Sequence, residues 1–197
     1  MQFDIPLHFG SAPTRLETHR ILLRPLVSDD AEALQRCASA REIADDMISI
    51  PHPYPEDEAS RFIAAHEEEF QAGRSVVFAL ERKSDRAFCG IIEIRDINRA
   101  HYNAEMSFWL AVHGWGNGYM SEALALAVDY AFQELRVNRL HAFHMVRNES
   151  SGKVLRKNGF QPEGLLRQCV YKCGKFEDVV LMAQVRGDWE SSRSEKS

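Results

Sequence analysis

The stretch HGWGNGYMSEAL, residues 113–124, places three glycines within five positions and continues directly into an apolar helical pattern. Glycine is costly to order, because the unfolded chain loses more conformational freedom there than at any other residue. A strand pattern precedes the glycines, so the first amides of the following helix lack intrahelical partners and point outward. Such amides, together with the helix dipole, form an anion site that a phosphate can approach closely.

Spacing excludes two nucleotide-binding patterns for this stretch. A dinucleotide fingerprint needs G-x-G-x-x-G, whereas Gly114, Gly116 and Gly118 give G-x-G-x-G and position 121 is serine. A Walker loop needs G-K-[ST], which the sequence does not contain. The alternative is a glycine-eased turn that binds nothing.

The length and composition predict a single globular domain. The chain has 197 residues, of which 45% are hydrophobic and 27% are charged. No apolar run approaches the roughly 18 residues of a membrane helix, and MQFDIPLHFG lacks the regions of a secretory signal. Four scattered cysteines predict reduced thiols rather than a disulfide framework, and no residue spacing indicates a metal site. We therefore expect a cytoplasmic protein without a membrane partner.

Charge is distributed unevenly along the chain. The formal net charge is −5, which argues against a nucleic-acid partner. Residues 41–70 carry nine acidic and two basic side chains, whereas residues 136–160 carry six basic and one acidic. These segments are either two solvated faces, or a side for a cationic substrate and a side for an anionic cofactor.

Hydrophobic periodicity and turn residues predict the order βααβββαβαββ, an α/β protein with a mixed sheet. The expected strands cover 19–27, 75–83, 88–97, 103–112, 140–146, the residues around 169–171, and 177–185. The expected helices cover 28–39, 55–71, 118–135 and 150–158, with His66 on the buried face of the second. Residues 15–188 form the predicted domain. We expect an N-terminal extension at 1–14 and a polar tail at 189–197, disordered after Trp189.

Four sequence blocks occur in a familiar order. They are LETHRILLRPL, W-G-x-G-Y-x-x-E-A, N-x-x-S-x-x-V-x-x-K-x-G-F, and F-x-x-E-G-x-L-R…G…D, and they extend over roughly residues 15–188. Together they resemble the GNAT superfamily of N-acetyltransferases, and more closely its ribosomal-protein N-terminal acetyltransferase branch. The resemblance implies the GNAT fold: a mixed, mostly antiparallel sheet in which two parallel strands, here 103–112 and 140–146, splay apart.

The resemblance also implies acetyl-CoA as cofactor. The family's diphosphate loop matches Trp115, Gly116, Asn117, Gly118, Tyr119 and Met120. Leu110 and Val112 on the preceding strand would pair their backbone with the pantetheine arm, and Asn148 would hydrogen-bond it. Trp115 and Met120 depart from the superfamily's usual residues. Trp115 is typical of the ribosomal branch, and Met120 implies a slightly different loop.

Three side chains are candidates for proton transfer. By analogy with the family, Glu105 is the expected base, with a salt bridge to a nearby arginine as the alternative. Ser151 is the expected acid near the thiol, although either Ser151 or Asn148 could instead cap the helix at 150–158. Tyr171 is a rival acid whose alternative is core packing. Direct attack in a ternary complex would suffice, with a strand amide near 109–110 stabilising the oxyanion.

The acceptor is expected to be a primary amine, most readily the α-amine of a protein or peptide. An α-amine titrates near about 7.7–8.0 and a lysine near about 10.4, so a weak, water-relayed base suits the former. The ribosomal subgroup places a glutamate where Val170 aligns, so that particular substrate does not follow. A small-molecule amine (polyamine, aminoglycoside or amino acid) and a non-catalytic acyl-CoA-binding module are the alternatives. The family is compatible with a monomer or a homodimer.

Overall fold

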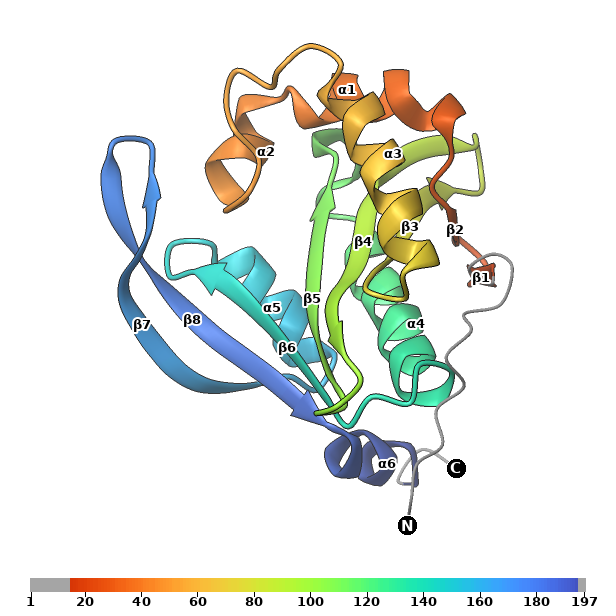
Figure 1. The fold of residues 1–197 in the computed structure, drawn as a ribbon, viewed down its shortest axis with the longest axis vertical. Coiled ribbons are helices and arrows are strands. Elements are labelled where there is room, and N and C mark those ends of the chain that lie inside the picture. The colour runs from red at the N-terminus through yellow and green to blue at the C-terminus, as the bar shows by residue number, and fades with distance from the viewer. Residues whose placement is uncertain (1–14, 195–197) are drawn as a thin grey trace.

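In residues 15–194, which the computed structural model describes, eight strands form one sheet in the order β1-β2-β3-β4-β5-β6-β8-β7 (Figure 1). The strands are β1 (Leu16–Glu17), β2 (Ile21–Pro25), β3 (Val76–Arg82), β4 (Ala87–Asn98), β5 (Asn103–Leu110), β6 (Arg139–Met145), β7 (Gln161–Lys172) and β8 (Lys175–Val185). The helices are α1 (Ala31–Ala38), α2 (Arg41–Asp46), α3 (Glu58–Gln71), α4 (Tyr119–Gln133), α5 (Glu149–Lys157) and α6 (Arg186–Ser194), with short 3₁₀ turns at Ser28–Asp30 and Val112–Gly114.

The parallel pair β5 and β6 separates along its length. Pairing runs from Asn103 opposite Arg139 to Glu105 opposite His141. Beyond this point β5 continues to Leu110 while it stays paired with β4 on its other edge. The other neighbouring strands are antiparallel. The predicted splayed pair in a mostly antiparallel sheet is therefore confirmed.

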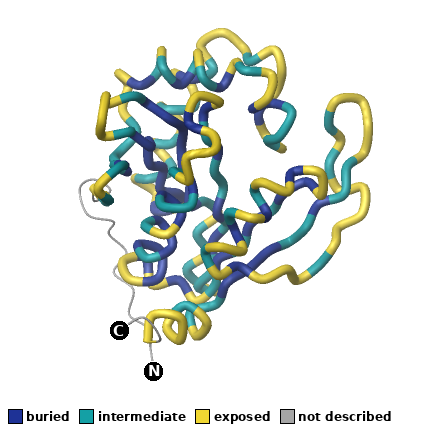
Figure 2. Tube along the Cα trace, turned by 180° about the vertical axis from the view of Figure 1, so that it is seen from behind, coloured by how far each residue is buried: buried dark blue, intermediate teal, exposed yellow. Residues whose placement is uncertain are grey.

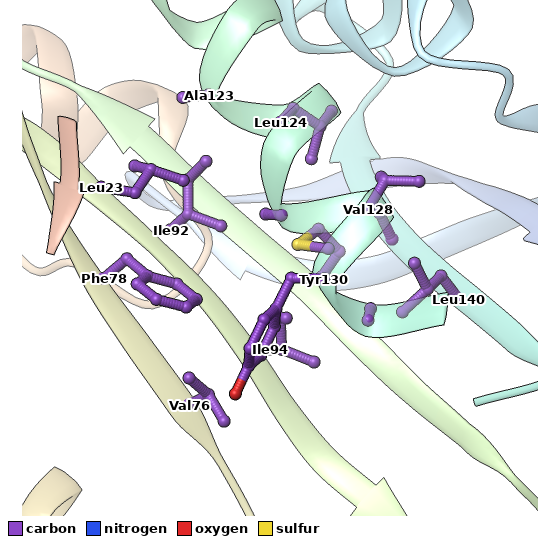
Figure 3. Packing of buried hydrophobic residues seen from close by; sticks show 14 of the residues in the cluster. Leu23, Val76, Phe78, Ile92, Ile94, Ala123, Leu124, Val128, Tyr130 and Leu140 are labelled. Carbon is purple, nitrogen blue, oxygen red and sulfur yellow. The ribbon is translucent and has the colours of Figure 1, made fainter. Parts of the chain in front are cut away.

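The two faces of the sheet are covered by different helices. Alternation along each strand sends one set of side chains to α4 and the other to α1, α2 and α3. On the α4 side, Phe78 meets the ring of Tyr130 edge-on at 5.3 Å, within the cluster drawn in Figure 3. On the other side, Trp109 belongs to the cluster that α1 and α2 cover. Figure 2 shows that the central strands are buried whereas the end of the β7–β8 hairpin is exposed. β4 and β5 are thus held rigidly from both faces.

The predicted elements are present, but the structure also contains β1, α2 and α6, and several element boundaries differ. Helix α2 was not expected, because its six residues are too few to show a helical period. Strand β5 ends at Leu110, so Val112 lies in a 3₁₀ turn and not on the strand. Strand β7 begins at Gln161, well before the predicted residues, because Pro162, Gly164 and two register shifts hide its alternation.

The expected disorder after Trp189 is wrong as far as Ser194, since residues 186–194 form α6. The Trp189 ring stacks on Phe132 at 5.3 Å, and its indole N–H donates to Asp129 Oδ1 at 2.7 Å. The contacts of Trp189 thus hold the otherwise polar helix α6 against α4. The extension predicted for 1–14 and the tail residues 195–197 lie outside the described residues. Within 15–194, no helix combines the length and apolar character needed to cross a membrane.

Candidate active site

The glycine loop turns sharply from β5 into α4. Gly116 and Gly118 have φ angles of +76° and +78°, a region that side chains with a Cβ rarely adopt. A Cβ added at Gly116 would meet no atom within 4 Å, so the space above it is open. None of the backbone amides of residues 116–120 donates a hydrogen bond to another residue of the described chain. Unpaired amides at a helix start beside open space suit a phosphate group.

Arg20 on the neighbouring segment braces this loop. Its Nη2 donates to the Asn117 carbonyl at 3.1 Å, and its Nε donates to Glu122 Oε1 at 2.8 Å. The guanidinium also lies 5.0 Å from the centre of the Tyr119 ring. Sequence reasoning missed Arg20, although it stands in the block LETHRILLRPL, because its partner Glu122 lies 102 residues away in the sequence. Arg20 therefore fixes the loop from outside.

Two side chains of the loop close it from within. The Trp115 indole N–H donates to the Leu110 carbonyl at 2.6 Å, and Asn117 Nδ2 donates to the Trp115 carbonyl at 2.9 Å. The Leu110 carbonyl, expected to pair with pantetheine, is thus already bonded within the protein. Trp115 and Met120 both line the cavity described next, whereas Val112 does not.

Three adjoining cavities follow the divergence of β5 and β6. The loop cavity, about 230 Å³, lies between the glycine loop, the end of β5, α2 and α5. The middle cavity, about 40 Å³, shares Phe108, Asn148 and Ser151 with it. The sheet cavity, about 190 Å³, lies over β4 and β5 beneath α1 and α3, and shares Arg95 and Ser107 with the middle one. Together they connect the glycine loop with the far face of the sheet.

Asn148 and Ser151 meet at the start of α5, in the wall shared by the loop and middle cavities. Asn148 is 7% exposed, and its Oδ1 accepts from the Ser151 amide at 3.0 Å, so the capping alternative is confirmed for Asn148. Its Nδ2 donates to the Asp46 carbonyl at 3.3 Å. In the described chain the Ser151 hydroxyl has no hydrogen-bond partner. It is therefore free to act within the cavity.

Glu105 faces the middle cavity and is paired with Arg95. Arg95 Nε lies 3.1 Å from Glu105 Oε1, and Arg95 Nη2 contacts the same oxygen. The salt-bridge alternative is therefore confirmed, yet the carboxylate still lines the cavity and 13% of its side chain is exposed. His141 Nε2 lies 4.0 Å from its other oxygen, and burial lowers the pKa of this imidazole.

A second carboxylate extends this pair into a row across the sheet. Glu93 Oε2 lies 3.7 Å from Arg95 Nη1, and Glu93 Oε1 lies 2.7 Å from His66 Nε2. Positive and negative groups alternate along the row, which we define as His66, Glu93, Arg95 and Glu105. The period of α3 placed His66 on its inner face but could not reveal a partner 27 residues away on β4.

Tyr171 is not brought to these cavities. It is 65% exposed near the end of the β7–β8 hairpin and lines none of the three. Its ring packs edge-on against Phe176 at 5.1 Å, a cross-strand contact on the surface. Between the two candidate acids, the geometry favours Ser151.

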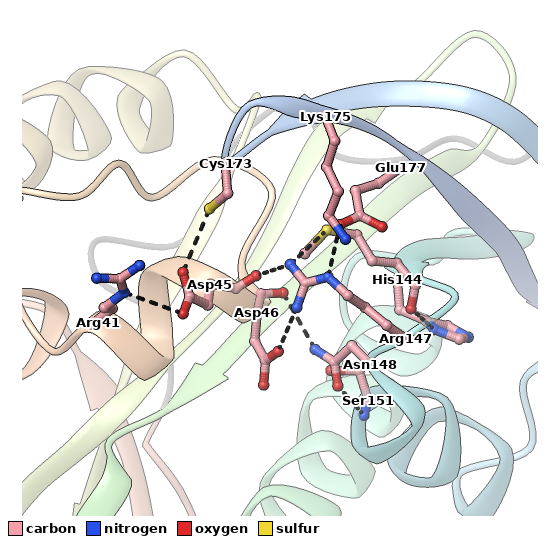
Figure 4. Close-up of polar contacts among 11 residues, drawn as sticks. Arg41, Asp45, Asp46, His144, Arg147, Asn148, Ser151, Cys173, Lys175 and Glu177 are labelled. Atoms are coloured by element: carbon pink, nitrogen blue, oxygen red, sulfur yellow. Dashed lines mark hydrogen bonds and ion pairs between the residues drawn. The ribbon is translucent and has the colours of Figure 1, made fainter.

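The acidic and basic segments of the sequence meet beside the loop cavity (Figure 4). Arg147 donates to Asp46 Oδ1 at 3.4 Å, to the Asp45 carbonyl, and to Glu177 Oε1 at 3.0 Å. Cys173 Sγ on the hairpin lies 3.5 Å from Asp45 Oδ1. Helix α2, the β6–α5 turn and the hairpin therefore form one wall. At this point the two charged segments pair with each other and are not separate solvated faces.

Comparison with known proteins gives relatives along nearly the whole chain. The model of the acetyltransferase (GNAT) domain matches residues 20–161. The uncharacterized N-acetyltransferase YoaA of Bacillus subtilis is 32% identical over 176 residues, which cover 87% of this chain and 96% of that protein. The [ribosomal protein uS5]-alanine N-acetyltransferase of Escherichia coli is 28% identical, with 91% and 94% covered. The spermidine N(1)-acetyltransferase of Escherichia coli is 25% identical, with 83% and 85% covered.

Solved structures share the fold. RimL, a ribosomal L7/L12 alpha-N-protein acetyltransferase in complex with coenzyme A, superposes with a TM-score of 0.81 at 19% identity, covering 87% of this chain and 98% of that one. RimJ of Mycobacterium smegmatis, in complex with CoA-disulfide, has a TM-score of 0.78 at 26% identity, with 85% and 83% covered. The predicted fold class is confirmed by these likenesses.

Proposed function

The chain belongs to the GNAT acetyltransferase family and is an acetyl-CoA-dependent N-acetyltransferase, and from that premise we propose that its acceptor is the α-amine of a protein or peptide. Four free cysteines fit a reducing compartment, and we place the reaction in the cytoplasm.

The loop cavity fits the cofactor on its own geometry. The unpaired amides of residues 116–120 and the open space above Gly116 suit a pyrophosphate, and the cavity continues from there toward Ser151. When bound, acetyl-CoA supplies an activated thioester carbonyl. We assign cofactor binding to Leu110, Asn148 and the loop residues Trp115, Gly116, Asn117, Gly118, Tyr119 and Met120, and not to Val112, which lies in the 3₁₀ turn outside the cavity lining.

Glu105 is proposed to take the proton of the acceptor ammonium, directly or through water. An N–H bond of the ammonium breaks and an O–H bond forms at the carboxylate, which leaves the amine with a free electron pair. The Ser151 hydroxyl, which also lines the middle cavity, carries a proton that it can give to the leaving group.

The charge balance of the row favours a singly charged acceptor, and this is the observation that carries the choice of amine. Both carboxylates of the row already face a cation, Arg95 or His66. The row can present at most one uncompensated negative charge, which matches one added ammonium, whereas the several charges of a polyamine would need several uncompensated carboxylates. In addition, deprotonating an α-amine costs about 3–4 kcal/mol less than deprotonating a lysine at neutral pH. Because one relative is a spermidine N(1)-acetyltransferase, a polyamine is the competing candidate for the acceptor.

A panel of amines tests this proposal. The protein is incubated with acetyl-CoA and, separately, a peptide with a free α-amine, the same peptide blocked at its N-terminus but containing lysine, spermidine, and an aminoglycoside. Thiol release gives the rate and mass spectrometry gives the acetylated position. We expect rapid acetylation of the free α-amine alone. Faster turnover of spermidine than of the free peptide would overturn the choice of acceptor.

A further inference from the structure

His66 is held by both of its ring nitrogens. Nδ1 lies 2.8 Å from the Phe62 carbonyl, which can only accept, so Nδ1 carries a hydrogen. Nε2 lies 2.7 Å from Glu93 Oε1, and a bond this short between an imidazole and a carboxylate requires a proton between them. The His66–Glu93 pair therefore holds one proton more than a neutral imidazole and a carboxylate would hold. Loss of this proton leaves His66 neutral and Glu93 ionised.

The surroundings of His66 determine how readily that proton is lost. Burial disfavours the charged imidazole, but the hydrogen bonds to Glu93 and to the Phe62 carbonyl, with the charges of Glu93 and Glu69, outweigh it and raise the pKa of His66 above 6.5. Glu58 and Tyr54 line the same cavity. The neighbouring surfaces of α1 and β3 are apolar, with Leu34, Ala38, Val77 and Ala79 in the cluster there.

Protonation of His66 changes the net charge of the row. With His66 charged, two cations face two carboxylates and the row is neutral. With His66 neutral, one cation, Arg95, faces two carboxylates and the row carries a charge of −1. Arg95 is then the one cation of the row for both Glu93 and Glu105, so its electrostatic interaction with Glu105 is weaker.

We propose that His66 is a positioning residue that sets the charge of the acceptor site, so that the row receives an ammonium only after His66 has lost its proton to solvent. This inference rests on the proposed function, in which Glu105 takes the proton of the acceptor. His66 acts through Glu93 and Arg95 and does not itself need to touch the amine. When His66 is neutral, the row carries one net negative charge, which matches one ammonium group.

Two substitutions change the row in opposite directions. His66→Gln fixes the charge at −1 at any pH at which both carboxylates are ionised, because Glu93 and Glu105 then face Arg95 alone. Glu93→Gln removes a carboxylate, so the row does not reach −1 even when His66 is neutral. His141→Gln is the matched control, since His141 also lies beside Glu105 but is outside the row.

The kinetic test is kcat/KM against pH for the free-amine peptide at saturating acetyl-CoA, which reports groups in the enzyme before the peptide binds. Wild type should lose activity by about tenfold per pH unit below the titration of His66. His66→Gln should keep nearly the same kcat/KM at pH 6 and pH 7, and Glu93→Gln should have a low kcat/KM at both. His141→Gln should keep the wild-type acidic limb. An unchanged limb in His66→Gln would overturn the proposal.

A titration independent of activity separates this inference from the proposed function. The His66 ring proton is followed by NMR against pH in wild type and in Glu93→Gln, without substrate. We expect a midpoint above 6.5 in wild type and a lower one in Glu93→Gln. A wild-type midpoint at or below 6.5 would overturn the role of His66 even if peptides are acetylated. Failure of wild type to acetylate any peptide would instead contradict the proposed acceptor, and the titration would still decide the state of the row.

Discussion

The two ends of the cavity system are built in different ways. At the glycine loop, on one side of the loop cavity, the anion site is formed by the unpaired backbone amides of residues 116–120, with the Arg20 brace behind them. The sheet cavity is formed by side chains from α1, α3, β4 and β5, which lie far apart in the sequence. Backbone recognition is tied to the loop's shape, whereas the charge of the sheet and middle cavities depends on ionisable side chains, among them the four of the row. One end therefore suits a constant cofactor, and the other can be altered for different acceptors.

Glu105→Gln should cause the largest loss and leave the cofactor end intact. Removing a general base reduces kcat by about 100-fold or more, because the amine then keeps its proton. The measurement is kcat with the free-amine peptide. The control is Glu163→Gln, which breaks the exposed pair with Arg139 and should retain wild-type kcat. A wild-type rate in Glu105→Gln would remove Glu105 from the mechanism.

Gly118→Val should weaken cofactor binding at the glycine loop and leave the charged row unchanged. The left-handed conformation of residue 118 costs a residue with a side chain about 1–2 kcal/mol or more. The free loop should therefore leave this conformation, and the dissociation constant for coenzyme A should rise by about tenfold. Isothermal titration with coenzyme A measures this. Gly174→Val is the matched control, because Gly174 has a similar φ of +82° but lies at the hairpin. Equal effects of the two substitutions would argue against the loop as the anion site.

Ser151→Ala removes a hydroxyl where the two ends meet. Its amide, which Asn148 caps, is retained, so α5 should be unaffected. We expect kcat to fall by roughly five- to tenfold, at the low end of acid catalysis because a thiolate leaves readily. Ser150→Ala, in the wall of the same loop cavity, is the control for simple repacking. No difference between the two variants would leave Ser151 without a role in proton transfer.

The His66–Glu93 pair should also appear in the stability of the fold. Because folding raises the pKa of His66, the pair contributes fully below pH of about 6.5, and the contribution is lost as pH rises through the folded-state value. Glu93→Gln should therefore lower the free energy of unfolding by about 1–3 kcal/mol at pH 6 and by less at pH 9. Denaturant unfolding at both pH values measures this.

The control for this effect is Glu17→Gln, which breaks an exposed pair with Lys83. It should change the free energy of unfolding by no more than about 1 kcal/mol at either pH. A loss in Glu93→Gln that is greater at pH 9 than at pH 6 would contradict the proton shared by His66 and Glu93.

The same contrast explains what could be predicted from the sequence. Local signals sufficed for the glycine loop and for the strands around it, whereas the splayed pair was expected only from the family resemblance. They failed where contacts join distant residues, as between His66 and Glu93, Arg20 and Glu122, or Trp189 and Phe132. Glu105 illustrates both cases, because its strand face was predictable but its pairing with Arg95 was only one of two alternatives.

The central claim is that the backbone loop holds the cofactor while the row of charged side chains prepares the amine. The affinity of Glu105→Gln for coenzyme A tests this most directly. We predict a dissociation constant within about twofold of wild type, in a variant whose kcat has fallen by about 100-fold. A dissociation constant raised by tenfold, as expected for Gly118→Val, would contradict the separation of the two ends.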